Sequence, residues 1–145
     1  MSERSAMTRI FKTQLVAGLI LLLTVVVLGC GGDTDADMVE LQRLESGDMD
    51  VVVLAPQDGL KNGSSEFLIE FRSNGTLTDV GDVRASSTMP MPGMPMFGSI
   101  DVQRTDVVGR YRARSEFSMA GTWQIAIEWN GPEGRRSVSF ASSVQ

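Results

Sequence analysis

Alternation of apolar and polar side chains with a period of two dominates most of this 145-residue chain. In residues 66–72 every second side chain is large and apolar (Phe67, Ile69 and Phe71), and residues 123–129 repeat the pattern with Trp and Ile. Successive side chains of a strand point to opposite faces, whereas an amphipathic helix needs apolar residues three or four positions apart. The pattern therefore predicts strands that each bury one face.

Short segments rich in Gly, Asn and Pro separate the alternating segments, as turns separate the strands of an antiparallel sheet. The predicted strands are 49–55, 66–72, 82–87, 99–104, 111–117, 123–129 and 136–142. Short strands at this spacing are typical of two packed antiparallel layers. We therefore expect an all-β fold, a small immunoglobulin-like β-sandwich of about seven strands, over residues 49–145.

The N-terminal segment has the layout of an export signal. Arg4, Arg9 and Lys12 precede an apolar run over residues 15–29, which ends at Cys30. This run of 15 residues is shorter than the roughly 20 that a helix needs to span a bilayer. The sequence therefore predicts that this segment directs the rest of the chain out of the cytoplasm, because the basic end stays inside.

The last residues of that run, Val27, Leu28 and Gly29, together with Cys30 resemble a bacterial lipobox. In such a motif the signal is cleaved before the Cys, which carries diacylglycerol. The resemblance implies a signal peptide at residues 1–29 and a lipoprotein attached to a membrane of the cell envelope through Cys30. The alternative is an uncleaved anchor with an inert, buried Cys. The remainder of the chain is exported under either interpretation.

Residues 30–48 are rich in carboxylates, contain two glycines directly after the Cys, and have few large apolar side chains. Such a stretch buries too little apolar surface to offset the entropy of ordering it. We expect a flexible acidic tether here, with a packed N-terminal helix as the alternative. Removing residues 1–29 takes three cations and one anion from the totals of 13 and 18 and leaves a net charge of −7. Charge therefore does not hold the exported part to anionic lipid.

Two gaps in the composition exclude most enzymatic chemistry. The chain has no His, and therefore no Ser-His-Asp or Cys-His machinery and no imidazole base. Its single Cys allows no internal disulfide or multi-thiolate metal site, and its carboxylates are scattered rather than paired. The net charge of −5 disfavours nucleic acid as a partner. We expect a binding or accessory module that is not an enzyme and has no small-molecule substrate.

Methionine and proline gather in an unusual cluster at residues 88–98, which read TMPMPGMPMFG. The methionines of this cluster are Met89, Met91, Met94 and Met96. The prolines exclude a helix or a central strand, and the Pro-Gly pair at residues 92–93 suits a turn that folds the second half of the cluster back on the first. A folded cluster can present up to four thioethers to one point.

Thioethers are soft, neutral ligands that suit Cu(I) and bind Zn(II), Mg(II) or Ca(II) poorly. We therefore predict a Cu(I) site formed by the four methionines of the cluster, with Met119 as a fifth ligand if its loop lies at the same end of the sandwich. Two alternatives stay open at this point. The cluster caps one end of the sandwich with Phe97 beneath it, or its methionines contact a partner protein.

Three spaced elements resemble the YtkA-like family, which is related to the FixH family. They are the MPMPGMPM cluster at 89–96, a G-x-Y element at 109–111 and an M-x-G-x-W element at 119–123. The resemblance implies an immunoglobulin-like domain that is exported or tethered to a membrane, of a kind also found attached to heavy-metal efflux adaptors. It further implies copper delivery or assembly of a respiratory oxidase, and hence an efflux system or an oxidase as the membrane-protein partner.

Many members of that family also carry His in the methionine-rich loop. This chain has none, which leaves Cu(I) as the expected ion. Gly109, Gly121 and Trp123 have an ordinary explanation as folding residues, since glycine suits turns and Trp supplies core area. The alternate arginines in residues 110–114 share one strand face, for which a solvated surface is the default interpretation.

Overall fold

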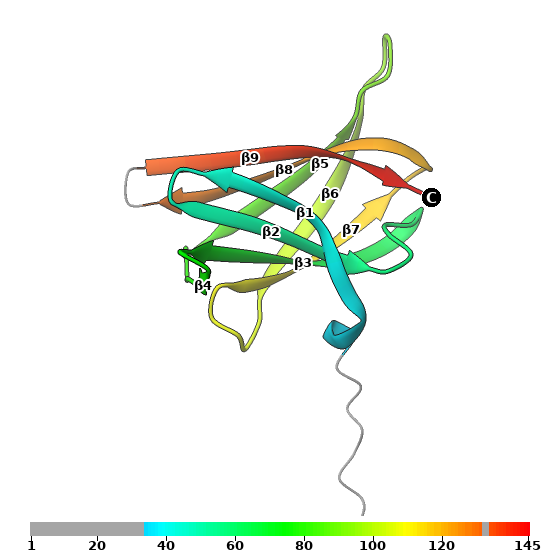
Figure 1. Cartoon of the computed structure of the whole chain (residues 1–145). Coiled ribbons are helices and arrows are strands. Elements are labelled where there is room, and N and C mark those ends of the chain that lie inside the picture. The colour runs from blue at the N-terminus through cyan, green and yellow to red at the C-terminus, as the bar shows by residue number, and fades with distance from the viewer. Residues whose placement is uncertain (1–33, 132–133) are drawn as a thin grey trace, which may run out of the picture. The chain divides into compact units, whose positions relative to one another are not determined.

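The computed structural model describes residues 34–131 and 134–145, which form a domain built almost entirely from strands (Figure 1). The elements are the 3-10 helix η1 (Thr34–Asp37) and the strands β1 (Met38–Ser46), β2 (Met49–Pro56), β3 (Gly63–Ser73), β4 (Thr76–Leu77), β5 (Val83–Met89), β6 (Met96–Arg104), β7 (Arg110–Phe117), β8 (Gly121–Gly131) and β9 (Gly134–Val144). Each of the seven predicted strands is confirmed. No helix among the described residues is long and apolar enough to cross a membrane. The predicted signal peptide at 1–29 and Cys30 lie outside the described residues.

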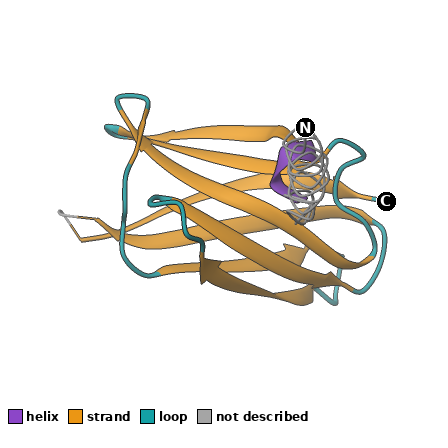
Figure 2. Cartoon of the chain, turned by 90° about the horizontal axis from the view of Figure 1, so that it is seen from below, coloured by secondary structure: helices purple, strands orange, loops and turns teal. Residues whose placement is uncertain are grey.

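The strand pairs are all antiparallel and form one hydrogen-bonded path in the order β1-β2-β3-β7-β6-β5-β8-β9, with β4 paired to the end of β3. Strand β6 changes partner at Ile100, because residues 96–100 pair with β5 and residues 100–104 pair with β7. The path therefore bends into two layers, β1-β2-β3-β7 and β5-β8-β9, which enclose the core (Figure 2). The prediction of a small antiparallel all-β sandwich is confirmed.

The core consists of the alternating side chains of both layers. Its largest members, none more than 2% exposed, include Val51, Val53, Phe67, Ile69 and Phe71 from one layer and Trp123, Ile125, Ile127 and Trp129 from the other. The ring of Phe71 packs edge-on against Trp129 of the opposite layer, with 5.1 Å between centroids. Burying each such side chain contributes about 1.5–3 kcal/mol, which is how a chain without an internal disulfide holds its two layers together.

The domain begins earlier than predicted. The flexible tether expected at residues 30–48 is wrong for residues 34–46, which form η1 and β1 and belong to the compact unit that extends to the C-terminus. Strand β1 pairs with β2 along its length, and Leu41 and Leu44 pack against the core. The register shifts after Glu40, and this irregularity interrupts the period of two by which the sequence would have indicated a strand.

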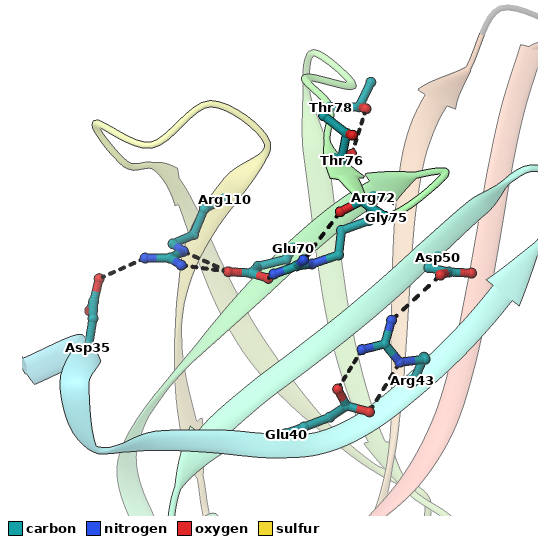
Figure 3. Close-up of polar contacts among 10 residues, drawn as sticks. All are labelled: Asp35, Glu40, Arg43, Asp50, Glu70, Arg72, Gly75, Thr76, Thr78 and Arg110. Carbon is teal, nitrogen blue, oxygen red and sulfur yellow. Dashed lines mark hydrogen bonds and ion pairs between the residues drawn. The ribbon is translucent and has the colours of Figure 1, made fainter.

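Ion pairs cover the outer face of the layer that contains β3 and β7. Glu70 of β3 is 1% exposed, and its carboxylate lies 2.6 Å from a guanidinium nitrogen of Arg72 and 2.7 Å from one of Arg110 (Figure 3). Burial raises the pKa of Glu70, but the hydrogen bonds from Arg72 and Arg110 outweigh burial, and the pKa lies below its usual value. Glu70 is therefore a buried charge that two cations neutralise.

Asp35 extends this network to the start of the domain. Its carboxylate accepts a hydrogen bond from Arg112 at 2.7 Å and lies 3.8 Å from Arg110, beside which Figure 3 shows it. Arg114 pairs with Glu66 at 2.8 Å. The alternate arginines of β7 are thus neutralised by carboxylates of the same domain, which leaves no case for an anion-binding stripe and ties η1 to the sheet.

We expect Glu70→Gln to destabilise the domain by about 2 kcal/mol at neutral pH, because it removes the carboxylate that two guanidinium groups share. The pKa of Glu70 is lower in the folded than in the unfolded chain, so its stabilisation is present above the unfolded pKa and is lost as the pH falls through the folded value. The difference from wild type should therefore shrink below about pH 4. Urea unfolding measures the free energy of unfolding of each variant, with Glu40→Gln as a control at an exposed position. Equal losses of stability in the two variants would contradict the role of Glu70 as a buried, doubly paired charge.

Candidate functional site

Strands β5 and β6 continue into a hairpin that projects from the body of the domain (Figure 1) and carries the methionine cluster. Met89 and Met96 form its last registered pair. At the tip, the N–H of Met94 donates a hydrogen bond to the carbonyl oxygen of Met91 at 3.3 Å, and Gly93 has a φ of 81°. A type II turn, in which Pro is common at the second position, requires this left-handed value at its third. The predicted reversal at the Pro-Gly pair is therefore confirmed.

Solvent exposure rises along this methionine hairpin, which we define as residues 88–98. Met89 is 7% exposed and belongs to the core, while Met96 opposite it is half-buried. Met91 is 42% exposed and Met94 75% exposed. The structure thus separates the cluster into a core methionine, a half-buried one and two at the exposed tip.

The loop between β7 and β8 lies at the same end of the sandwich as the methionine hairpin. A Cβ atom on Gly121 would lie 2.7 Å from Cε of Met89, so the thioether of Met89 packs directly on this glycine. Met119, just before Gly121, is 38% exposed, and its carbonyl oxygen accepts a hydrogen bond from the indole N–H of Trp123 at 3.1 Å. Met119 therefore lies at the same end of the domain as the hairpin, which is the condition under which it was predicted to be a fifth ligand.

The core beneath the methionine hairpin is aromatic. The fully buried Trp123 lies 5.3 Å from Phe117, measured between ring centroids, and both pack in the cluster that includes Met89. Phe97, which the capping alternative places beneath the hairpin, is instead 79% exposed. That expectation is wrong, because Phe97 directly follows Met96 and the alternation of the strand turns it to the outer face.

The G-x-Y element builds the opposite end of the sandwich. Gly109 has a φ of 79°, and a Cβ atom there would lie 2.6 Å from the backbone nitrogen of Thr78. The hydroxyl of Tyr111 lies 2.9 Å from a carboxylate oxygen of Asp79 and 2.9 Å from the carbonyl oxygen of Gly81. Burial, followed by the hydrogen bond to Asp79, raises the pKa of Tyr111 to about 12. These contacts give Gly109 and Tyr111 a role in folding.

A cavity of about 630 Å³ opens at the end of the sandwich near Asp79. Its walls combine the apolar side chains of Met49, Val80 and Trp129 with polar groups that include Asp48. The sequence does not indicate this cavity, because its residues come from separate turns and strand ends and share no motif. In the part of the chain that the structure describes, no group of three or more His, Cys, Asp or Glu side chains is placed to hold a metal ion.

Comparison with known families accounts for the spaced elements. The family described as YtkA-like matches residues 43–128, more than half of the chain. The chain belongs to the YtkA-like family. The elements at 89–96, 109–111 and 119–123 all lie within the matched region, so the resemblance that they indicated is confirmed.

The YtkA-like domain is also similar to solved structures. One is a DUF4426 family protein from Pseudomonas aeruginosa PAO1, with a TM-score of 0.53 and 15% identity over 74% of this chain and 94% of that one. Another is FetP of uropathogenic E. coli strain F11, with a TM-score of 0.46 and 10% identity over 72% of this chain and 93% of that one. The first likeness supports the fold alone. No curated protein matches the sequence.

We expect Gly109→Ala to destabilise the YtkA-like domain by about 3 kcal/mol, since its Cβ would meet the backbone of Thr78, which cannot move aside as a flexible side chain can. Gly59→Ala is the matched control. Gly59 has the same φ of 79° but nothing within 4 Å of its Cβ position. It should lose only about 1 kcal/mol, from left-handed strain. Thermal unfolding measures both variants, and equal losses would show that the contact with Thr78 is unimportant.

Proposed function

We propose that the chain is an exported lipoprotein, anchored through Cys30 in a membrane of the cell envelope, whose domain binds Cu(I) and hands it over at the methionine hairpin. The observation that carries the metal assignment is the hairpin itself. A Pro-Gly turn closes its two arms, and the exposure of its methionines rises from 7% at Met89 to 75% at Met94. The proposed role is not catalytic.

Alternation along the two arms favours one side of the hairpin for all four methionines. Met89 and Met96 pair across the arms, and Met91 and Met94 are each two positions nearer the tip, so an extended backbone directs them to the same face. Thioether sulfur is a soft donor that suits Cu(I). The accessible donors in this arrangement are Met91, Met94 and the half-buried Met96.

Met89 and Met119 have different parts in the proposal. The thioether of Met89 packs on Gly121 and fixes the base of the hairpin to the core. Met119 lies at the same end of the domain, is 38% exposed, and supplies a further sulfur if the hairpin bends toward it. Three or four neutral donors on an exposed turn exchange their ion readily, which suits transfer rather than storage.

Export and anchoring rest on the N-terminal sequence. A basic end, an apolar run of 15 residues and a lipobox-like ending at Cys30 form the layout of a lipoprotein signal. The partner of such a copper carrier is an efflux system or a respiratory oxidase under assembly, as the YtkA-like and FixH resemblance implies.

A second function is that of a protein-interaction module without a metal site. Phe97 is 79% exposed and Met94 is 75% exposed, and both belong to the projecting hairpin. Large apolar side chains gathered on a surface are typical of contact sites. In this alternative the hairpin docks onto a membrane complex, so that Phe97→Ser weakens the complex while Cu(I) has no effect on it.

We expect the protein to take up Cu(I) under reducing, anaerobic conditions, and the triple Met→Leu variant at positions 91, 94 and 96 to bind it at least about tenfold more weakly, because the tip then has no soft donor. Competition with a chromogenic Cu(I) chelator measures the affinity. Leu has nearly the volume of Met, so the fold should be retained.

The control for this titration replaces Met38 and Met49, which lie outside the hairpin, by Leu. It should leave uptake unchanged. Equal uptake by wild type and by a variant in which all four hairpin methionines are Leu would contradict a metal site at the hairpin and leave the interaction module as the better account.

We expect metabolic labelling with a fatty acid to mark the wild-type protein and not Cys30→Ala, because the thiol of Cys30 is the proposed attachment point. The variant should also move from the membrane fraction to the soluble fraction unless its apolar run of residues 15–29 stays uncleaved. Mass spectrometry of the N-terminus distinguishes these cases. An unlabelled wild type would refute the lipoprotein assignment.

A further inference from the structure

We infer that the methionine hairpin faces away from the membrane that holds the anchor, and that it docks onto a protein surface in the aqueous compartment. The inference rests on the proposed anchor at Cys30 and goes beyond it by assigning the orientation of the domain and the kind of partner. The surface concerned is the tip and outer face of the hairpin, where Met94 and Phe97 are exposed.

The chain between the anchor and the domain is short. The first described element begins at Thr34, four peptide steps after Cys30. A chain advances at most about 3.6 Å per residue, so these steps span no more than about 14 Å. The contacts of Asp35 with Arg112 and Arg110 hold η1 to β7, and β1 is paired along its length, so neither element adds to this reach.

The start of the domain and the methionine hairpin lie on opposite sides of the sandwich. In Figure 1 η1 is at the lower side and the hairpin projects from the upper side, and Figure 2, seen from below, shows η1 in front. A domain of about 110 residues has a radius of gyration of about 13 Å and hence a diameter of roughly 34 Å. If the tip of the hairpin lay in the bilayer, Thr34 would be on the far side of the domain. Its distance from the bilayer would then exceed the roughly 14 Å that the tether can span.

The exposed apolar side chains of the hairpin therefore contact a binding partner other than lipid. No charged residue occurs between Thr88 and Ile100, although the exported part as a whole is acidic. An uncharged projecting surface on an acidic protein fits an apolar cleft in a partner protein. Since the hairpin is proposed to hand over Cu(I), we assign as partner an extramembrane protein domain that offers such a cleft for Phe97 and soft sulfur ligands beside it.

A fluorescence experiment on the mature acylated protein, which begins at Cys30, tests the orientation. Cys30 is the only Cys and carries the lipid, so a thiol introduced by Met94→Cys or by Val39→Cys can be labelled alone with an environment-sensitive dye. Both positions are exposed, at 75% and 46%, and Val39 lies next to η1. Each labelled protein is bound to phosphatidylcholine vesicles that contain headgroup-nitroxide lipids, and iodide serves as the aqueous quencher.

We expect the nitroxide lipids to remove most of the fluorescence of the dye at Val39 and almost none at Met94, while iodide quenches the dye at Met94. Lipid quenching at Met94 equal to or greater than that at Val39 would overturn the inference and identify the bilayer as the occupant. If the wild type is neither acylated nor bound to vesicles, the anchor itself fails. That result is distinct, because it refutes the proposed anchoring as well as the orientation.

Discussion

The change of partner by β6 at Ile100 is the constraint on which the rest of the structure depends. Its second half pairs with β7 and its first half with β5, so this strand joins the two layers and closes the core between them. The same first half is an arm of the methionine hairpin. Because both halves are paired, β6 cannot slip by one residue without exchanging the inward Met96 for the outward Phe97. The register of one strand thereby decides which side chains the hairpin offers to solvent.

The strands were predictable because a strand with one buried face has an apolar side chain at every second position. Phe67, Ile69 and Phe71 mark β3 so clearly that only its bounds remained to be found. Strand β1 was missed because its register shifts after Glu40, which breaks the alternation, and because it has as many carboxylates as leucines, two of each. For the same reason the exposure of Phe97 was within reach of the sequence, since its place next to Met96 already separates the two residues onto different faces.

The candidate site was predictable in its chemistry and not in its geometry. Sulfur donors and a Pro-Gly turn are properties of neighbouring residues, so the sequence contains them directly. How deep the base of the hairpin sits depends on Gly121, which leaves room for the thioether of Met89 from a different strand. Gly109 is similar, since the sequence indicates a turn but not that Thr78 lies against it. These contacts join residues that are far apart in the sequence. Like the cavity near Trp129, they form only when the strands have paired and packed, so the sequence does not indicate them.

The methionines of the hairpin differ in solvent exposure, and they therefore also differ in their susceptibility to oxidation. Oxidants convert accessible methionine to the sulfoxide, a polar and chiral group whose oxygen is a poor ligand for a soft ion. Met94 and Met91 would be converted first, while Met89 is shielded by the core. Oxidation of the tip would therefore remove soft donors from the proposed Cu(I) site while the sandwich stays folded, and methionine sulfoxide reductases can reverse this change.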